Sequence, residues 1–586
     1  MQSKSFDTSL NSLFSKSIRF LKPYKLKFFL SIFCLVSGVA IGLIEPLIWG
    51  KLLTALFSKD YQIIVKLISY IVIIYLSQVT LNYLQSFLFS YLNENIIYDL
   101  KKGIFQKIMN LQISSFEEIG QGGFLSRLHE DTATVSNLIT QEFTNISLDI
   151  LRVVFVGVIV FTISPILAII TLISFPITYF INLKFGVRLK EKNKTTMIVY
   201  DEYFDVLQES LSGIKEIKSL GIKKERINLF LVLSSKIKKN NIEMNLLFAL
   251  SNNISQIVNY TTQIVLYSVG AYLIIKGNLK VEYFIAFTSY SQQFLRSLGN
   301  LTRINLSLRK AGVSLQRIYE LLDLNSNEFF GDQEVQMIQG EIKFENVSFS
   351  YKNEQSKPVL KNICMQIKPG KKYVLVGLNG AGKSTIFNLI TRFYDSDTGN
   401  ITLDGIDIKD FSENSLRENI AIVRQEPTLF NMSIKDNLLL ANPSSSLEDI
   451  VDSCEKVNIH NFILNLPEGY NTKLINDAHN FSGGQRQSLA FARAILKKSK
   501  IILFDEATSA LDNDTQFSIK RIIDSLSTDH TVIIIAHRLL NIIDADEIIV
   551  VNNGEITNQG THSHLLAVDN LYQRLYQEEL NFIRER

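Results

Sequence analysis

The segment from Gly377 to Thr385 has the residue types and the spacing of a phosphate-binding loop. It fits the pattern G-x-x-x-x-G-K-[ST] and directly follows the apolar run Tyr373 to Val376, so a strand, a loop and a helix are expected in that order. Glycines allow backbone angles that other residues avoid, so that successive N–H groups can curl around a phosphate. Lys383 is expected on the β- and γ-phosphates and the Ser384 hydroxyl on Mg²⁺. The other loop positions predicted to line the phosphates are Gly377, Asn379, Gly380, Ala381, Gly382 and Thr385.

Two acidic residues follow another apolar run, Ile501 to Phe504. A buried strand over this run places Asp505 and Glu506 at its carboxyl end, which is where nucleotides lie in α/β domains. Asp505 suits Mg²⁺, usually through water, and Glu506 suits a general base that polarises the attacking water. The pair predicts hydrolysis of the terminal phosphate bond of a bound nucleotide.

Two further polar residues also end apolar runs. Gln425 follows the run from residue 420 to 424 and can reach both Mg²⁺ and the attacking water. His537 follows the run Thr531 to Ala536 and can donate to the γ-phosphate. We therefore expect Gln425 and His537 to join Glu506 in catalysis.

A second glycine pair, in Ser482-Gly483-Gly484-Gln485, opens the predicted helix Arg486 to Leu496. A helix N-terminus attracts an anion, yet the same domain already has a phosphate loop. Our interpretation is that this second site serves the nucleotide of another copy, so that two domains sandwich two ATP molecules head to tail. The alternative is a glycine-rich turn that Ser482 caps.

Length and composition indicate a membrane portion beside this domain. The 586 residues are too many for one core, and 46% hydrophobic residues with a mean hydropathy of +0.14 is high for a soluble enzyme. The net charge of +3 is nearly balanced, which gives no support to a nucleic-acid partner. Cys34, Cys364 and Cys454 show neither pairing nor metal-like spacing.

Six apolar segments are long enough to cross a membrane. Residues 1–27 hold six Lys or Arg against one acid, so the positive-inside rule places the N-terminus in the cytoplasm. Residues 28–50 form the first span and are too long for the core of a cleaved signal peptide. The later spans are expected at 67–92, 143–163, 166–187, 250–275 and 282–302, with tight outer turns at 164–165 and 276–282. Six spans return the chain, and its C-terminus, to the cytoplasm.

The stretches between spans two and three, and between spans four and five, are mostly polar with helical periodicity, so we expect long helices that extend into the cytoplasm. The domains follow as a membrane domain over 28–323, a linker over 324–339 and a soluble domain over 340–586. The predicted fold class is an all-α six-helix transmembrane domain followed by an α/β P-loop ATPase domain with a helical subdomain.

Taken together, these motifs resemble the ATP-binding-cassette (ABC) family, in order and in spacing. The matches are Gly377–Ser384 to its Walker A, Gln425 to its Q-loop, Phe481–Gln487 to its signature, Ile501–Asp505 to its Walker B, Ser509–Asp512 to its D-loop and His537 to its switch histidine. Tyr351 matches the aromatic residue that stacks on adenine in this family. Ser115-Phe116-Glu117-Glu118, with residues 122–131 after it, resembles the first cytoplasmic coupling region of its exporters.

The chain departs from the family pattern at two places. Phe481 replaces the Leu that usually opens the signature, which is a change between apolar residues. Residues 474–478 read Leu-Ile-Asn-Asp-Ala where exporters tend to carry Val-Gly-Glu-Arg-Gly, so that Asn476 stands at the acid expected to touch the coupling helices. The departure concerns communication between domains, whereas Glu506 keeps hydrolysis intact.

The resemblance implies an ATP-driven, multi-pass transporter of a bacterial cell membrane. Its cofactors would be ATP and Mg²⁺, and its cargo a peptide or a lipid-like, amphipathic molecule exported by alternating access. Six spans before one cassette imply a half-transporter that pairs with a second copy of itself or with a similar chain. Two alternatives remain open: an importer built on exporter topology, and an ATP-gated channel or membrane regulator.

Two polar stripes in the last two spans are the candidates for contact with the substrate. In span five, Asn252, Gln256, Asn259 and Gln263 recur at helical spacing, and in span six Ser289, Gln293, Arg296 and Asn300 repeat it. Such stripes should face each other or a cavity, because polar groups facing lipid are costly; the alternative is hydrogen bonding between helices.

Arg296 is the charged member of these stripes. Glu45 in span one lies at a different depth, so we do not expect the two to pair. Unless it snorkels to the inner interface, Arg296 is expected to present positive charge to an inward-open cavity. It would then favour substrates that carry an anionic group.

Overall fold

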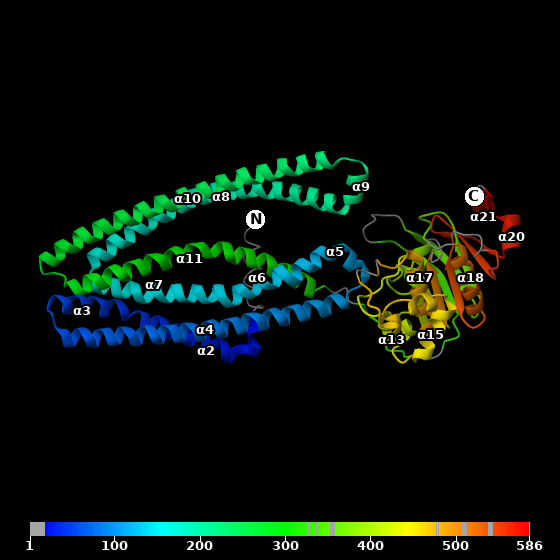
Figure 1. Cartoon of the computed structure of the whole chain (residues 1–586), viewed down its shortest axis with the longest axis horizontal. Helices are drawn as coiled ribbons and strands as arrows, with labels where there is room; N and C mark the ends of the chain where they lie inside the picture. The colour runs from blue at the N-terminus through cyan, green and yellow to red at the C-terminus, as the bar shows by residue number, and fades with distance from the viewer. Residues whose placement is uncertain are drawn as a thin grey trace. The chain divides into compact units, whose positions relative to one another are not determined.

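The structure is a computed structural model that describes residues 18–324, 328–335, 338–351, 358–475, 478, 480–505, 513–536 and 543–584 (Figure 1). Its contacts divide the chain into two compact units. The helical unit consists of Met1–Lys107 and Gly122–Leu324, and the α/β unit of Ile108–Gln121 and Asn325–Arg586. A short piece of the chain between the second and third spans thus belongs to the α/β unit.

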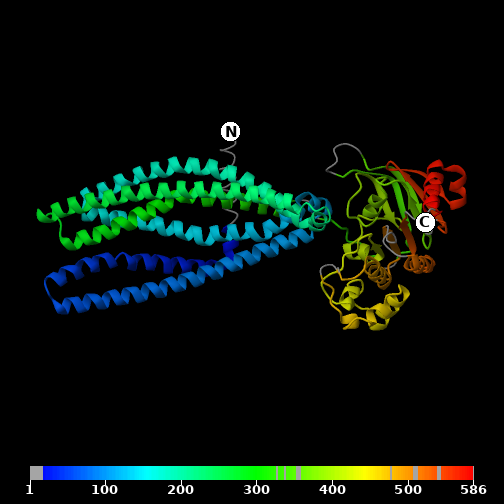
Figure 2. The ribbon, with the colours of Figure 1, turned by 45° about the horizontal axis from the view of Figure 1, so that its top comes forward.

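Long antiparallel helices make up the helical unit (Figures 1 and 2). Its helices are α2 (Lys25–Gly42), α3 (Glu45–Phe57), α4 (Tyr61–Met109), α6 (Thr132–Asn137), α7 (Phe143–Ile163), α8 (Pro165–Ser212), α9 (Ile214–Ser219), α10 (Lys223–Ile275) and α11 (Val281–Leu322), with a 3₁₀ turn η1 (Ile18–Tyr24) before them. α5 (Ile113–Ser126) begins in the α/β unit and enters the helical unit at Gly122. α8 and α10, of 48 and 53 residues, pack along each other. The long helices that the sequence predicts beyond the spans are therefore present.

Each of the six predicted spans lies in this set of helices. Among the described residues, five stretches are long and apolar enough to cross a membrane: Phe20–Phe57, Tyr61–Met109, Ile113–Ile163, Pro165–Ser212 and Lys223–Ile275. α11 carries the sixth span and is not one of these five. Its Ala286, Phe287 and Tyr290 have no exposed surface, in a cluster with residues of α7, α8 and α10. Because neighbouring helices cover much of α11, it needs fewer apolar side chains.

The first span is not one straight helix, as the sequence suggested, but breaks between Gly42 and Glu45. Pro46 has no N–H to donate to the carbonyl four residues earlier, so the ladder is interrupted there. The Tyr290 hydroxyl of α11 donates to the Leu43 carbonyl at this break. The phenol of α11 thereby gives the Leu43 carbonyl a hydrogen bond that the hydrocarbon of a bilayer cannot supply.

Between α5 and α7 the chain contains two π-helical segments, η2 (Arg127–Asp131) and η3 (Leu138–Glu142), on either side of α6. Asp131 is buried in η2 and accepts a 2.6 Å hydrogen bond from the Ser314 hydroxyl of α11. The Arg317 guanidinium lies 3.6 Å from the other oxygen of that carboxylate. This charged group holds the wide helical turn against α11.

Two sheets form the frame of the α/β unit. An antiparallel sheet has the order β2-β1-β4-β5, and a six-stranded sheet has the order β10-β9-β3-β8-β7-β6, in which only β10 is antiparallel. The strands are β1 (Ile342–Phe349), β2 (Leu360–Ile367), β3 (Lys372–Val376), β4 (Thr398–Leu403), β5 (Ile406–Asp407), β6 (Ile420–Val423), β7 (Ile501–Asp505), β8 (Thr531–Ile535), β9 (Glu547–Asn552) and β10 (Glu555–Gly560). The helices are α12 (Lys383–Ile390), α13 (Glu413–Asn419), α14 (Ile434–Leu439), α15 (Leu447–Lys456), α16 (His460–Leu464), α17 (Gly483–Leu496), α18 (Asn513–Leu526), α20 (His562–Val568) and α21 (Asn570–Arg584), with a 3₁₀ turn η4 (Gly469–Asn471).

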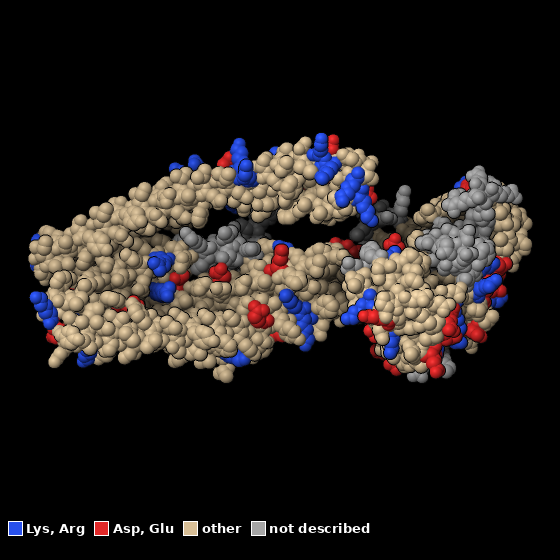
Figure 3. Space-filling model, in the orientation of Figure 1, with Lys and Arg blue, Asp and Glu red and all other residues tan. Residues whose placement is uncertain are grey.

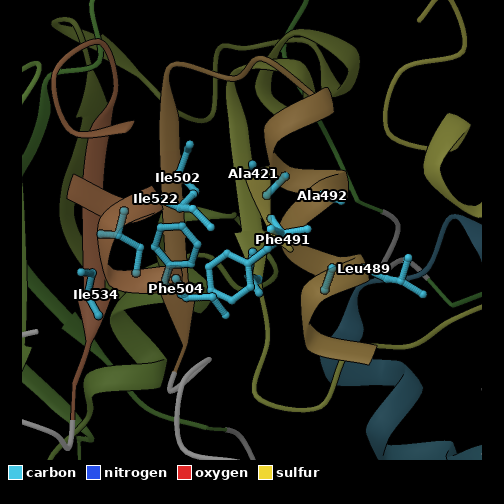
Figure 4. Packing of buried hydrophobic residues seen from close by; sticks show 14 of the residues in the cluster. Ala421, Leu489, Phe491, Ala492, Ile502, Phe504, Ile522 and Ile534 are labelled. Carbon is cyan, nitrogen blue, oxygen red and sulfur yellow. The ribbon is translucent and has the colours of Figure 1, made fainter. Parts of the chain in front are cut away.

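The six-stranded sheet is buried on both faces, which explains its continuous apolar strands. On one face, Leu375 and Leu503 pack with α12 and the antiparallel sheet. On the other face, Phe504 and Ile534 pack with α14 to α18 (Figure 4). The predicted strands over 501–504 and 531–536 are confirmed as parallel neighbours, and α14 to α16 form the predicted helical subdomain.

Charged side chains are distributed differently in the two units. The visible face of the helical unit in Figure 3 is mostly uncharged, whereas residues of both signs are dense on the visible face of the α/β unit. Lipid-facing helices account for the first pattern, and a water-exposed domain for the second.

Candidate nucleotide site

The loop from residue 377 to 382 leads from β3 into α12, as its sequence predicts. Gly382 is the N-cap of α12 with φ of 104°, and a Cβ there would lie 2.6 Å from the Leu360 side chain. A Cβ on Gly377 would lie 2.1 Å from the Val551 carbonyl oxygen. Gly380 also has a left-handed backbone, with φ of 80°. Only glycines fit these places, so the loop has the tight path that a phosphate cradle needs.

The Lys383 ammonium folds back over this loop. It donates to the carbonyl oxygens of Gly377 and Leu378, at 2.8 Å and 3.1 Å, and its side chain is nearly buried. Next to it, the Ser384 hydroxyl lies 3.5 Å from the Asp505 carboxylate at the end of β7. The structure therefore brings together the predicted phosphate ligand Lys383 and two of the three predicted Mg²⁺ ligands, Ser384 and Asp505. Two oxygen ligands beside a phosphate loop form a donor set that suits Mg²⁺.

Tyr351 lies beside the same loop. Its hydroxyl is 3.2 Å from the Thr385 hydroxyl and accepts a 3.3 Å bond from the Asn388 amide. Its ring packs edge-on against Phe349 and Tyr394, at centroid distances of 4.9 Å and 5.1 Å. This places an aromatic ring next to the phosphate loop, where the family resemblance expects one.

The predicted catalytic residues are described only in part. Gln425 follows β6 and is exposed, and β6 is the neighbour of β7, which ends at Asp505. Glu506 and His537 lie outside the described residues, as do Asn476 and the D-loop residues 509–512. The strands that precede Glu506 and His537, β7 and β8, are adjacent and parallel. Adjacent parallel strands end at the same edge of the sheet. The catalytic roles of Glu506 and His537 therefore stay predictions, and the strand arrangement agrees with them.

The signature segment opens α17 with a capping box. The Ser482 hydroxyl accepts from the Gln485 N–H at 3.2 Å, and the Gln485 side chain accepts from the Ser482 N–H at 2.9 Å. Ser482 is exposed, and a Cβ added to Gly483 would meet nothing within 4 Å. Gly484 follows in the first turn of the helix. The turn is thus capped, as the alternative interpretation states, and it also leaves its backbone open to a ligand.

The phosphate loop and the signature begin helices on opposite faces of the six-stranded sheet. Buried residues of α12, such as Ile386 and Phe387, belong to the cluster on one face. Those of α17, such as Leu489 and Phe491, belong to the cluster on the other. This separation agrees with the interpretation that the signature serves another copy's nucleotide.

Sequence reasoning missed one contact near this site. The Tyr394 hydroxyl donates a 2.7 Å hydrogen bond to the Glu117 carboxylate of α5, and burial together with this bond raises the pKa of Tyr394. Both residues line a pocket of about 280 Å³ that Tyr351 also lines. Gly120, with φ of 70°, ends the first part of α5 just after Glu117. No local pattern marks Tyr394, because its partner lies 277 residues away.

Comparison with known proteins identifies the family. Residues 28–298 match the model of the ABC transporter transmembrane region, and residues 360–509 match that of the ABC transporter. An ATP-dependent lipid A-core flippase of Pasteurella multocida is 32% identical over 607 aligned positions, covering 99% of this chain and 100% of the flippase. The chain belongs to the ABC transporter family. A flippase of the same name from Syntrophus aciditrophicus is 29% identical, covering 96% of this chain and 94% of its own.

The fold of this ABC transporter also has a solved counterpart. A bacterial Atm1-family ABC exporter with ATP bound matches with a TM-score of 0.79 over 95% of this chain and 98% of its own, at 23% identity. The exporter-type architecture, a membrane domain fused to one cassette, is thereby confirmed. The transporter is a multi-pass plasma-membrane protein that binds ATP and couples its hydrolysis to substrate movement across the membrane.

The candidate substrate residues lie in α10 and α11 of the transporter. Gln256, Asn259 and Arg296 are exposed, and Asn252, Gln263 and Gln293 are half-buried. Within the described part of the chain, none of these six side chains makes a hydrogen bond or an ion pair. The alternative, hydrogen bonding between helices, thus has no support from these six side chains among the described contacts.

Glu45 and Arg296 lie at different depths, as predicted. Gly50 packs against the Glu282 backbone and Leu43 receives the bond from Tyr290, so α3 and α11 run antiparallel. Arg296 is a further six residues along α11, or about 9 Å below Tyr290. Glu45 instead accepts a 3.0 Å hydrogen bond from the Tyr75 hydroxyl.

Proposed function

We propose that this ABC exporter works as a homodimer that moves a lipid-like or peptide substrate with an anionic group out of the cytoplasm by alternating access. The observation that carries the substrate class is Arg296, exposed on α11 and, among the described residues, without a hydrogen bond or ion pair. A cation within a membrane-spanning helix is costly unless it faces water or an opposite charge. The anionic group of a substrate supplies that charge.

Two further observations support the proposal. The amides of Gln256 and Asn259 are exposed on the neighbouring helix α10, where they can bind the polar part of an amphipathic molecule. Among the relatives, two are named as lipid A-core flippases, which favours a lipid-like cargo over an imported solute. Both termini lie in the cytoplasm in this arrangement, because the cassette follows the sixth span.

In the proposed cycle, each ATP binds between the phosphate loop of one chain and the signature of the other. Mg²⁺, held by Ser384 and Asp505 with help from Gln425, supplies neutralisation of phosphate charge when bound. Glu506 accepts the proton of the attacking water, and His537 donates to the γ-phosphate. Driving the membrane domains from 1:99 to 99:1 between two states needs about 5.5 kcal/mol of differential binding. Closure of the cassettes on ATP provides it, and hydrolysis resets the dimer.

The test compares substrates and variants of the purified transporter in liposomes. We expect an anionic phospholipid probe to stimulate ATP hydrolysis more than a probe with a neutral headgroup and the same acyl chains. Arg296→Ala should abolish this stimulation, and Arg296→Lys should keep part of it, because a lysine retains the charge but not the planar fork. Basal ATP hydrolysis should survive in both variants.

The matched control is Lys280→Ala, which removes an exposed positive charge from the turn before α11. It should leave stimulation unchanged. Unchanged transport in Arg296→Ala, at normal expression, would contradict the substrate class. If acidic peptides stimulate hydrolysis more than the lipid does, the substrate is still anionic, but it is a peptide and not a lipid.

A further inference from the structure

One buried side chain joins the signature helix to the Q-loop. Gln487 lies two residues after the capping-box residue Gln485 and is only 1% exposed. Its Nε2 donates a 3.1 Å hydrogen bond to the backbone carbonyl of Gln425. An amide on the helix that begins at Ser482 thus holds the residue predicted to position Mg²⁺ and the attacking water.

The other half of this amide is unsatisfied. Gln487 Oε1 is buried without a hydrogen-bond partner in the described structure. A buried acceptor without a partner costs stability, and an apolar side chain of similar size would fill the same space without that cost. Unlike an apolar side chain, the amide donates a hydrogen bond to the Gln425 carbonyl.

Further contacts join α17 to the segment after Gln425 and to strands β6 and β7. Arg493 donates to the Thr428 carbonyl at 2.9 Å, and Lys497 donates to the carbonyl of Ile420, the first residue of β6, at 2.8 Å. Phe491 stacks on Phe504, one residue before Asp505, with ring centroids 5.0 Å apart (Figure 4). α17 is thus in contact both with Gln425 and with the strand that ends at Asp505.

We propose that Gln487 is a positioning residue that couples the two ATP sites of the dimer. In the head-to-tail arrangement proposed above, on which this inference rests, Ser482 and Gly484 contact the ATP held by the partner's phosphate loop. Gln425 of the same chain belongs to the other ATP, held by its own Lys383. The bond from Gln487 to Gln425 is the direct link between these two groups. Closure of the site that contains Ser482 and Gly484 then positions Gln425 at the other ATP site. Hydrolysis therefore responds cooperatively to ATP.

The experiment measures ATP hydrolysis by the full chain in liposomes over a range of ATP concentrations. The wild type should give a Hill coefficient clearly above 1, with 2 as the limit for two sites. Gln487→Met and Gln487→Leu both lack the amide and differ in shape, and both should lower the coefficient to about 1. Turnover at saturating ATP should stay within about threefold of wild type, because neither variant removes a group that touches ATP.

Thermal unfolding separates this role from a structural one. The midpoints of both variants should equal or exceed that of the wild type, since the unsatisfied acceptor is gone and Gln425, an exposed residue, lies within reach of water. Ser488→Ala, at the next buried position of α17, is the matched control and should keep the wild-type Hill coefficient.

Three outcomes would overturn the inference: non-cooperative hydrolysis by the wild type, an unchanged Hill coefficient in both folded variants, or loss of folding in both variants. Failure of the head-to-tail dimer itself is distinguishable, because it appears in the mixed-chain experiment described below, in which Gln487 is intact. Failure of the substrate class appears only in the Arg296 variants.

Discussion

At the scale of single residues, the position of Asp505 explains how the site assembles. Its carboxylate ends β7 and lies 3.5 Å from the Ser384 hydroxyl, which comes from α12, the helix that follows β3. Glu506 follows directly in sequence, and we expect it to act on the attacking water while Asp505 serves Mg²⁺. Two adjacent acids at one strand end can therefore take different roles.

We expect Glu506→Gln to retain ATP binding and to lose turnover. The glutamine keeps the shape of the side chain but cannot accept the proton of water, and losing a general base costs roughly 10²- to 10⁴-fold. The measurement is phosphate release at saturating ATP, beside nucleotide binding in the same preparation. Glu555→Gln makes the same chemical change at an exposed position of β10 and should leave turnover intact. Turnover of the Glu506 variant within about threefold of wild type would contradict the assignment.

At the scale of elements, the first part of α5 connects the membrane-domain sequence to the cassette. Ile108–Gln121 belongs to the α/β unit, and the Tyr394–Glu117 bond fixes it there. Tyr394 also packs against Tyr351, whose hydroxyl contacts Thr385 of the phosphate loop. A chain of contacts therefore runs from the phosphate loop to the segment that resembles the family's first coupling region.

Tyr394→Phe should uncouple substrate from hydrolysis. The ring stays against Tyr351 while the bond to the carboxylate is lost, and a hydrogen bond to a charged group contributes about 1.5 to 3 kcal/mol. Because Tyr394 is partly exposed, we expect a loss near the lower end, or roughly a tenfold weaker coupling. Basal ATP hydrolysis should remain within about twofold of wild type, and substrate stimulation should fall.

The matched control is Tyr470→Phe, which removes a phenol bonded to His460 in the helical subdomain of the same unit. It should leave stimulation unchanged. If substrate stimulates ATP hydrolysis by Tyr394→Phe as strongly as in the wild type, the prediction is contradicted. The Tyr394–Glu117 bond would then only hold the α5 segment in place.

At the scale of the whole molecule, the positions of the two predicted ATP-contacting elements of one chain favour the proposed head-to-tail dimer. α12 and α17 lie on opposite faces of the six-stranded sheet, which supports the proposal that a complete site combines the phosphate loop of one chain with the signature of another. Under this proposal, hydrolysis as well as transport requires the dimer.

Mixing two defective chains tests this arrangement. A Lys383→Ala chain lacks the phosphate ligand, and a Gly484→Asp chain places a carboxylate where the signature should meet phosphate. Each homodimer should be inactive, whereas the heterodimer should keep one complete site and up to half of the wild-type hydrolysis. The measurement uses separately tagged chains and purification on both tags. A heterodimer as inactive as both homodimers would contradict the head-to-tail pairing.

Local patterns in the sequence determined much of this transporter. The phosphate loop between β3 and α12, the Ser482 cap of α17 and the long helices beyond the spans each depend on residues close together in the chain. Glycine at positive φ, an N-cap hydroxyl and apolar periodicity are signals that depend on neighbouring residues in the chain and not on tertiary packing. The sequence also predicted the two parallel strands that end at Asp505 and near His537.

Only the tertiary structure decided which distant groups meet. Tyr290 satisfies the Leu43 carbonyl at a break that the apolar run 28–50 did not reveal, and Tyr394 bonds to Glu117 from a loop with no motif of its own. Gln487 was predicted as part of the signature, but its bond to Gln425 depends on α17 packing across β6 and β7. Such contacts join residues 62 to 277 positions apart. No periodicity encodes them, because they follow from how whole helices and strands pack once their apolar faces are buried.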